Sequence, residues 1–352
     1  MSVTLLALAA CTGGGADHPA GAASSRPAGA RPSAQSASPS TDPRPVTLSF
    51  AGDVHFATKL APLLDHPSTA LTSLVPYLGS SDLAMVNLET AITTRGAAQP
   101  KQYHFRAPAT AFQAVTSGGI DAVTMANNHA ADYGSVGLAD TLAGIAKSPI
   151  PVVGIGADAA AAYAPAYVDL RGTRVALLAA MQVPDWTAAH FAAGPHSPGV
   201  ATAFDPSRLA AAVRAAKRKA DVVVVFMHWG TEYTTCPNAL QQSTAKALAA
   251  AGASVIVGAH AHKLMGAGWL GHTYVDYGLG NFVWWRRQTT VETWTGVLTL
   301  TLDGRRVAAA SWQPMVVGAS GLPAVPSATQ TAKLAAYWKG LRHCTGLAAH
   351  PS

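Results

Sequence analysis

Two histidines, His260 and His262, stand two residues apart directly after the apolar stretch 254–257. The stretch predicts a buried strand. Because alternate side chains of an extended segment point to the same face, both imidazoles would reach one point just past the strand's end. Such a pair suits coordination of a metal ion. The alternative is a pair of structural histidines held by hydrogen bonds, and residues elsewhere in the chain decide between these interpretations.

Four further predicted strands end in the same way, with polar side chains directly after the apolar residues. In chain order these side chains are Asp53 and His55 after the strand predicted over 46–51, Glu89 after 83–86, Asn128 and His129 after 122–125, and His228 after 221–227. The recurrence at five strand ends favours a common site over unrelated loop residues.

Helical patterns separate these strands and decide where their ends meet. The predicted helices cover 68–78, 109–117, 135–146, 206–220, 238–251 and 328–342, and a hairpin with an Asp303-Gly304 turn joins 294–302 to 307–317. Strands that alternate with helices predict an α/β fold with a largely parallel sheet. In such sheets the functional crevice lies past the carboxyl ends of the strands, where all the candidate residues stand.

The candidate ligands fit a centre with two divalent metal ions. They are Asp53, His55, Glu89, Asn128, His228, His260 and His262. Oxygen and imidazole ligands without thiolate favour Mn²⁺, Fe or Zn²⁺, and the sequence does not choose among them. Two ions about 3.5–4 Å apart can clamp both the attacking and the leaving oxygen of a displacement. The chemistry that this predicts is hydrolysis of a phosphoester.

At these residues the chain resembles the CapA family of poly-γ-glutamate capsule synthesis proteins, whose domain is similar to the calcineurin-like metallophosphoesterases. The resemblance covers 46–283. Its marks are Gly52-Asp53-Val54, Asn87-Leu88-Glu89, Ala126-Asn127-Asn128-His129 with Asp132 and Gly134, His228-Trp229-Gly230 with Glu232-Tyr233, Gly258-Ala259-His260-Ala261-His262, and Leu279-Gly280-Asn281-Phe282. The resemblance implies a four-layer α/β/β/α sandwich of metallophosphoesterase type.

The same resemblance implies a role for each candidate. It divides six ligands between two ions, with Asp53, His55 and His262 on one and Asn128, His228 and His260 on the other. Glu89 would bridge the ions, in a place where those enzymes have an aspartate. His129 would be the general acid next to the leaving group.

Other residues near the motifs have two open interpretations each. Lys101, His104 and Arg106 would either bind an anionic substrate or belong to a solvated loop. Trp229, Glu232 and Asn281 would either line the site or serve the local structure. Arg286 and Arg287 would form either a substrate clamp or an exposed rim.

The first 45 residues predict export and anchoring. Residues 1–11 end in Leu8-Ala9-Ala10-Cys11, which resembles the lipobox of bacterial lipoproteins, although no Lys or Arg precedes the apolar run. A chance cysteine is the alternative. Residues 12–45, rich in Gly, Ala, Ser and Pro, predict a disordered tether. The expected protein is an extracytoplasmic lipoprotein of the bacterial cell membrane, with a CapA-like domain over 46–320 and a C-terminal helix and tail over 321–352 that pack on it.

The remaining cysteines, Cys236 and Cys344, form an even pair. Outside the cytoplasm such a pair predicts a disulfide. Metal binding by them is the weaker alternative, since neither stands in a typical zinc-ligand spacing.

Composition excludes one class of partner and leaves others open. The net charge is +6, but the Lys and Arg residues are scattered, so we expect no nucleic acid to bind. The expected partners are an anionic small molecule or an envelope polymer such as poly-γ-glutamate.

Three functions compete. The first is a metal-dependent hydrolase, the second a non-hydrolytic component of poly-γ-glutamate synthesis, export or anchoring, and the third a binding module with structural metals. The complete ligand set argues against the third, and the oligomeric state stays open.

Overall fold

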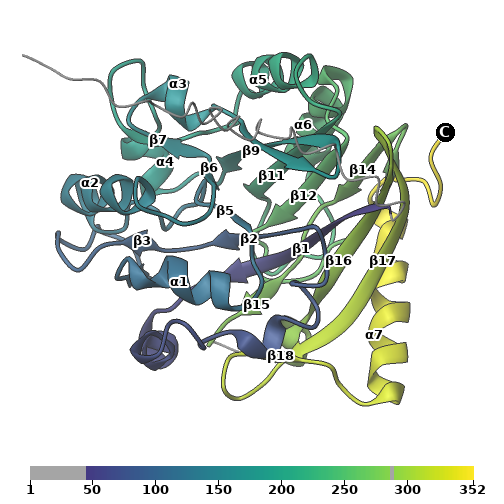
Figure 1. Ribbon diagram of the computed structural model, residues 1–352, viewed down its shortest axis with the longest axis horizontal. Coiled ribbons are helices and arrows are strands. Elements are labelled where there is room, and N and C mark those ends of the chain that lie inside the picture. The colour runs from purple at the N-terminus through teal and green to yellow at the C-terminus, as the bar shows by residue number, and fades with distance from the viewer. Residues whose placement is uncertain (1–44, 286–288) are drawn as a thin grey trace, which may run out of the picture. The chain divides into compact units, whose positions relative to one another are not determined.

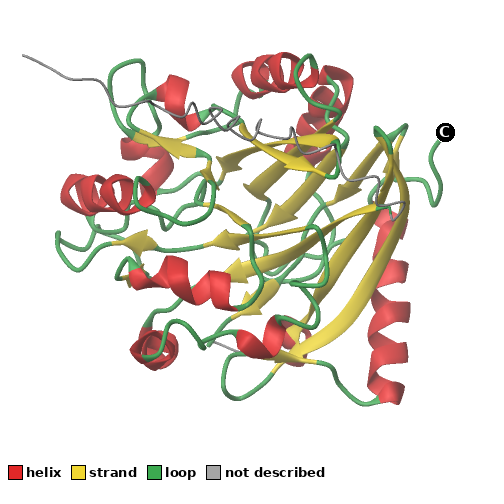
Figure 2. Cartoon of the chain, in the orientation of Figure 1, coloured by secondary structure: helices red, strands yellow, loops and turns green. Residues whose placement is uncertain are grey.

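Two large β-sheets form the centre of the protein in the computed structural model, which describes residues 45–285 and 289–352 (Figure 1). Among these residues, one sheet has eight strands in the order β18-β17-β16-β1-β2-β5-β6, with β15 also paired to β1. The other has six strands in the order β13-β14-β12-β11-β9-β8. Figure 2 shows the strands at the centre with helices on the outside.

The strands have the following bounds. The eight-stranded sheet contains β1 (Val46–Val54), β2 (Leu83–Leu88), β5 (Ala122–Thr124), β6 (Val152–Val153), β15 (Asn281–Val283), β16 (Trp294–Asp303), β17 (Arg306–Val317) and β18 (Pro323–Ala324). The six-stranded sheet contains β8 (Ala166–Leu170), β9 (Thr173–Gln182), β11 (Val222–Trp229), β12 (Val255–Ala259), β13 (Ala267–Leu270) and β14 (Thr273–Asp276). Two small sheets pair β3 (Ala91–Ile92) with β4 (Arg106–Ala107), and β7 (Ile155–Gly156) with β10 (Gly199–Val200).

The helices follow the alternation that the sequence predicts. The α-helices are α1 (Thr110–Ser117), α2 (Gly134–Ile145), α3 (Ala159–Ala162), α4 (Trp186–Phe191), α5 (Ser207–Lys217), α6 (Ala239–Ala251) and α7 (Ala328–Gly340). Short 3₁₀ segments are η1 (Thr58–Asp65), η2 (Thr72–Leu74), η3 (Thr290–Thr293) and η4 (Leu341–Cys344).

Three apolar cores separate four layers. In β9, Leu177 packs between the two sheets while its neighbour Leu178 packs under α5 and α6. In β1, Phe50 packs between the sheets while its neighbour Ala51 packs toward α1 and η1. Because successive strand residues point to opposite faces, both faces of each sheet are buried. The predicted four-layer α/β/β/α arrangement is confirmed.

The close approach of two chain segments depends on a glycine at the end of β1. A Cβ at Gly52 would stand 1.7 Å from the carbonyl oxygen of Gly280, which accepts a hydrogen bond from the Asp53 N–H at 3.0 Å. Only glycine lets the backbones meet this closely. The contact aligns β1 with β15, whose first residue pairs with Asp53.

Two predictions from the sequence need correction, and two edge strands were not predicted. The stretch 274–282, interpreted as one strand and a polar turn, contains two strands in different sheets, β14 and β15. The helix predicted over 68–78 is a set of turns around η2. The edge strands β8 and β13 were not predicted, since each is at most 5 residues long and pairs on one side only.

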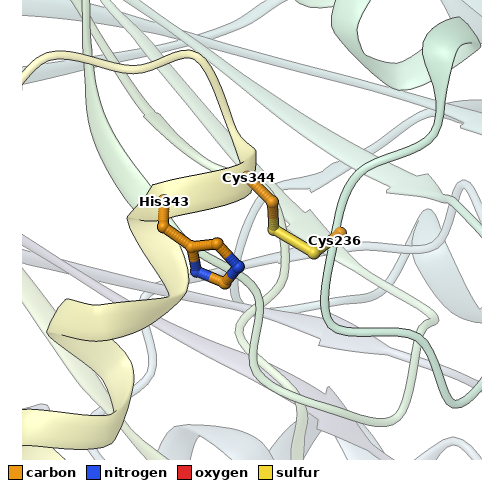
Figure 3. Close-up of side chains that lie close together, drawn as sticks. All are labelled: Cys236, His343 and Cys344. Carbon is orange, nitrogen blue, oxygen red and sulfur yellow. A yellow bond between two sulfur atoms is a disulfide. The ribbon is translucent and has the colours of Figure 1, made fainter.

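The C-terminal segment packs on the eight-stranded sheet and is tied to a distant loop. The rings of Trp338 in α7 and Trp312 in β17 stack with centroids 5.0 Å apart. A disulfide joins Cys344 to Cys236, 108 residues earlier in the chain, and Figure 3 shows it between η4 and the loop after β11. The predicted lipobox with Cys11 and the tether up to residue 44 lie outside the described residues. No helix in the described ranges is long and apolar enough to cross a membrane.

Candidate metal centre

The deepest part of the site is a triad of Asp53, Glu89 and His228, which come from the ends of β1, β2 and β11. One potential ligand atom from each lies within 4.8 Å of the others, and all three side chains are fully buried. The ends of both sheets therefore meet here. Parallel strands of the two sheets contribute their carboxyl ends to one point, as the sequence predicts for this edge.

A second triad adjoins the first and contains Glu232, His260 and His262, again with ligand atoms within 4.8 Å of one another. The Nδ1 atom of His262 lies 3.6 Å from Oδ2 of Asp53. The rings of His228 and His260 have centroids 4.8 Å apart. The two histidines that follow β12 thus reach the same site as the first triad.

The remaining predicted ligands lie beside these groups. Oδ1 of Asn128 accepts a hydrogen bond from Nε2 of His228 at 2.8 Å. The His55 ring stacks on Phe105 with centroids 4.3 Å apart, and its Nδ1 accepts a hydrogen bond from the Ala57 N–H at 3.1 Å. Ligation through Nε2 of His55 would require the other tautomer of this ring.

Buried atoms without partners show that these residues fit a cation. Among the described residues, His55 Nε2, Glu89 Oε1 and His260 Nδ1 are buried and have no hydrogen-bond partner. Buried polar atoms in folded proteins are nearly always satisfied, so three exceptions in one site are what residues suited to bind a cation would show. Two are imidazole nitrogens and one is a carboxylate oxygen, the donor set that Mn²⁺, Fe and Zn²⁺ accept.

The local electrostatics keep three of the four candidate imidazoles neutral and therefore available as ligands, whereas at His262 the effect of burial is outweighed by the hydrogen bond and charge of Asp53, which raise the pKa. Burial, followed by the neighbouring imidazoles, holds the pKa of His55, His228 and His260 well below the usual histidine range. Burial and the charge of Asp53 raise the pKa of Glu89 well above its usual value. A bound cation would oppose the shift at Glu89, because it favours the ionised carboxylate.

Unusual backbone angles set the direction of the two histidines after β12. His260 has φ of 93° and His262 has φ of 56°, both in the left-handed region that non-glycine residues rarely adopt. The His260 N–H donates to Oδ2 of Asp53 at 3.2 Å, and His262 Nδ1–H donates to Oδ1 of Asn281 at 2.8 Å. Strain of this kind persists where the surroundings hold it in place, typically at functional sites.

His129, the predicted general acid, has a different environment. Its Nδ1–H donates to Oδ2 of Asp132 at 2.6 Å, and its Nε2 lies 3.7 Å from Oε1 of Glu89. Asp132 also accepts from the Phe105 N–H at 2.7 Å and pairs with Lys101 at 2.7 Å. Burial lowers the pKa of His129, against the opposing effect of Asp132. The Nδ1 atom is thus fixed by the protein, while Nε2 faces the metal ligands.

Sequence reasoning missed two residues that organise the site. Asn87 donates through Nδ2 to Oδ1 of Asp53 at 2.8 Å, and its own Oδ1 accepts from Asn127 at 3.0 Å. Asn87 stands two residues before Glu89 on the same strand, a spacing that could have revealed it. The Phe105 ring stacks on both His55 and His129, with the second centroid distance at 4.2 Å. No local pattern marks Phe105.

The candidates with two open interpretations divide between residues that line the site and residues that support the local structure. Lys101 pairs with Asp132 and, at 3.0 Å, with Asp185, and Arg106 lies over the Tyr133 ring at 4.3 Å. His104 contacts the Gln99 carbonyl, and Trp229 is buried with its Nε1–H donating to the Tyr277 carbonyl at 3.0 Å. Glu232 and Asn281 line the pocket above the ligands, together with the aromatic residues Tyr103, Phe105, Trp284 and Trp285. Arg286 and Arg287 lie outside the described residues.

These features define a four-layer α/β/β/α protein with a polar site of candidate metal ligands at the carboxyl ends of its strands. The family model of the bacterial capsule synthesis protein PGA_cap matches residues 47–284, so the chain belongs to this family. The predicted membership of the CapA family is confirmed.

Two relatives and one solved structure illustrate the similarity. PGA biosynthesis protein CapA of Bacillus subtilis is 32% identical over 243 residues, which are 68% of this chain and 63% of that protein. Capsule biosynthesis protein CapA of Bacillus anthracis is 30% identical over 248 residues, covering 68% and 59%. The matched region therefore spans about three-fifths of each relative. A novel phosphatase from Mycoplasma pneumoniae superposes with a TM-score of 0.49 at 14% identity, covering 78% of this chain and 94% of that one.

Proposed function

We propose that the protein is a metal-dependent hydrolase that cleaves a phosphoester or related bond in the metabolism of an envelope or capsule polymer. One observation carries the proposal: buried carboxylate, amide and imidazole groups converge within a single site, three of their atoms have no hydrogen-bond partner among the described residues, and a histidine held by a carboxylate stands next to them.

The residues that would hold two divalent ions are those that the sequence predicts. They are Asp53, His55, Glu89, Asn128, His228, His260 and His262. Bound divalent ions supply Lewis acidity and lower the pKa of a water molecule, which makes hydrolysis possible near neutral pH. Asn87 orients Asp53, and Asn281 fixes the tautomer of His262 by accepting its Nδ1–H, which leaves Nε2 of that ring as the ligand atom.

His129 would first take up a proton at Nε2, a state that the charge of Asp132 favours, and would then deliver this proton to the leaving oxygen and return to the neutral ring. Asp132 and Lys101 hold its ring from behind, so Nε2 is the atom that faces the substrate side. A positioned acid of this kind typically contributes about 10²–10⁴ in rate. The aromatic walls made by Phe105 and Trp284 exclude water around the reacting groups.

A second function is favoured by the family itself. The relatives are named for poly-γ-glutamate and capsule biosynthesis, and the same metal centre would then serve to handle that polymer without hydrolysis.

Cell-surface anchoring through Cys11 belongs to both proposals. Cys11→Ser should release the protein from the membrane fraction, whereas membrane retention of this variant would refute the lipid anchor.

The deciding experiment is metal analysis of the purified protein, followed by a screen against phosphoesters and poly-γ-glutamate. The hydrolase proposal expects phosphoester cleavage that chelation abolishes and Mn²⁺ or Zn²⁺ restores. Metal-loaded protein that binds poly-γ-glutamate and cleaves nothing in the screen would replace hydrolysis with polymer handling.

A further inference from the structure

The loop between β11 and α6 turns back toward the two histidines that follow β12. Gly230 with φ of 99° and Tyr233 with φ of 62° make the turn. The Tyr233 N–H donates to the carbonyl of Ala261 at 2.8 Å, directly between His260 and His262. This backbone contact brings Glu232, the residue before Tyr233, to the same place, which is why its carboxylate joins the second triad.

The same loop is fastened at its far end. Asn238 begins α6 with a capping box, in which its Oδ1 accepts from the Gln241 N–H at 2.9 Å. Cys236 ties the loop covalently to η4 through the disulfide in Figure 3. Glu232 is exposed at the rim of the pocket, yet the chain on both sides of it is fixed. Its carboxylate is therefore held near the histidines without being buried.

The two triads differ in charge and exposure. The inner triad has two carboxylates and one imidazole, all fully buried, whereas the outer triad has one carboxylate and two imidazoles and reaches the pocket. In the outer triad, Nδ1 of His260 is buried and has no partner among the described residues. A ligand set of one carboxylate and two imidazoles is common for Zn²⁺.

We propose that Glu232 is a metal ligand that, together with His260 and His262, holds the outer of two ions. This inference rests on the proposed metal centre and changes its division. In the division implied by the resemblance, His260 and His262 serve different ions and Glu232 serves neither. Because Glu232 stands at the rim, the outer ion exchanges with solvent more readily than the inner ion, so Glu232 sets how many ions the protein holds.

The test is a titration of the chelator-treated full chain with Zn²⁺ by calorimetry, repeated with Co²⁺ by absorption spectroscopy. Wild type should bind two ions. Glu232→Gln should bind the first with unchanged affinity and the second at least about tenfold more weakly, and the Co²⁺ spectrum of the second ion should change. The control is Glu292→Gln, which removes one negative charge from a buried side chain in the wall of the same pocket, keeps an oxygen for the Thr289 N–H, and should leave both affinities unchanged.

The outcomes separate this inference from the proposed function. Wild type that binds two ions, with Glu232→Gln binding both equally well, would exclude Glu232 as a ligand and leave the metal centre intact. Equal weakening in Glu232→Gln and Glu292→Gln would assign the effect to pocket charge and also overturn ligation. Wild type that binds no ion would instead overturn the metal centre and the proposed function. Thermal unfolding of each metal-free variant checks that folding is unchanged.

Discussion

The strand ends after β5 and β12 both deliver histidine to the site, but the protein treats them differently. After β5, Asn127 donates to the Leu88 carbonyl at 2.9 Å, and its Oδ1 accepts from the His129 N–H at 3.1 Å. His129 itself is tied to Asp132. After β12, His260 and His262 have left-handed backbones, and Nδ1 of His260 has no partner among the described residues.

This difference separates two kinds of chemistry. A group that transfers a proton must be held by the protein, because its orientation and protonation state decide the rate. A group that binds a cation keeps a lone pair free, and the cation later offsets both the unsatisfied atom and the backbone strain. In the proposed function, His129, which is held by Asp132, would transfer a proton, and His260, whose Nδ1 has no hydrogen-bond partner among the described residues, would bind a cation.

The largest effect should come from removing the support of the strand end after β12. Gly52→Ala would place a Cβ 1.7 Å from the Gly280 carbonyl oxygen, so the backbone before Asn281 must move, and with it Asp53 and His262. We expect a loss of at least about 4 kcal/mol in the free energy of unfolding, measured by denaturant titration, together with loss of bound metal.

The control for this change is Gly340→Ala at the end of α7, where an added Cβ meets nothing within 4 Å. It should be neutral or stabilising by up to about 1 kcal/mol, because alanine favours a helix over glycine. A Gly52→Ala protein as stable and as metal-rich as Gly340→Ala would show that the close approach of β1 and β15 does not support the site.

The next effect concerns the strand end after β5 alone. His129→Asn should lower the rate of phosphoester cleavage by about 10²–10⁴ while leaving the metal content and the unfolding temperature close to wild type. Its task in this account is proton transfer and not ligation. Steady-state kinetics and metal analysis on the same sample measure both quantities, and a loss of metal in this variant would remove the distinction between the two strand ends.

A further prediction concerns a buried carboxyl away from the site, whose effect depends on pH. Burial raises the pKa of Asp276 in β14 to about 7, although the hydrogen bond from the Gly278 N–H opposes the shift. The folded state therefore holds a proton that the unfolded chain releases near pH 4. The contribution of the protonated carboxyl to the free energy of unfolding is at its full value below about pH 4. It falls as the pH rises to about 7, by up to roughly 1.4 kcal/mol per pH unit.

Asp276→Asn should remove this dependence. The difference in free energy of unfolding between variant and wild type should grow from pH 4 to pH 7 in favour of the variant and then level off. Denaturant titrations at pH 5, 6, 7 and 8 measure it. A difference that stays constant over this range would show that Asp276 does not titrate there and would contradict the raised pKa.

The sequence predicted the strand ends because buried parallel strands read as continuous apolar runs and their polar ends are easily seen. β11, fully buried along Val222–Trp229, is the clearest case. The division of the strands between two sheets came only from the family resemblance, since periodicity does not say which strands pair. The stacking of Phe105 on His55 and His129, and the turn that brings Glu232 to His260, depend on loop geometry that no local pattern encodes.

The most direct test of the account is the number of metal ions bound by His260→Ala compared with wild type and His129→Asn. The measurement is elemental analysis of equally purified, metal-loaded proteins, with circular dichroism to check folding. The account predicts two ions per chain in wild type and in His129→Asn, and about one in His260→Ala. Unchanged metal content in His260→Ala would make the pair after β12 structural and would contradict the metal centre.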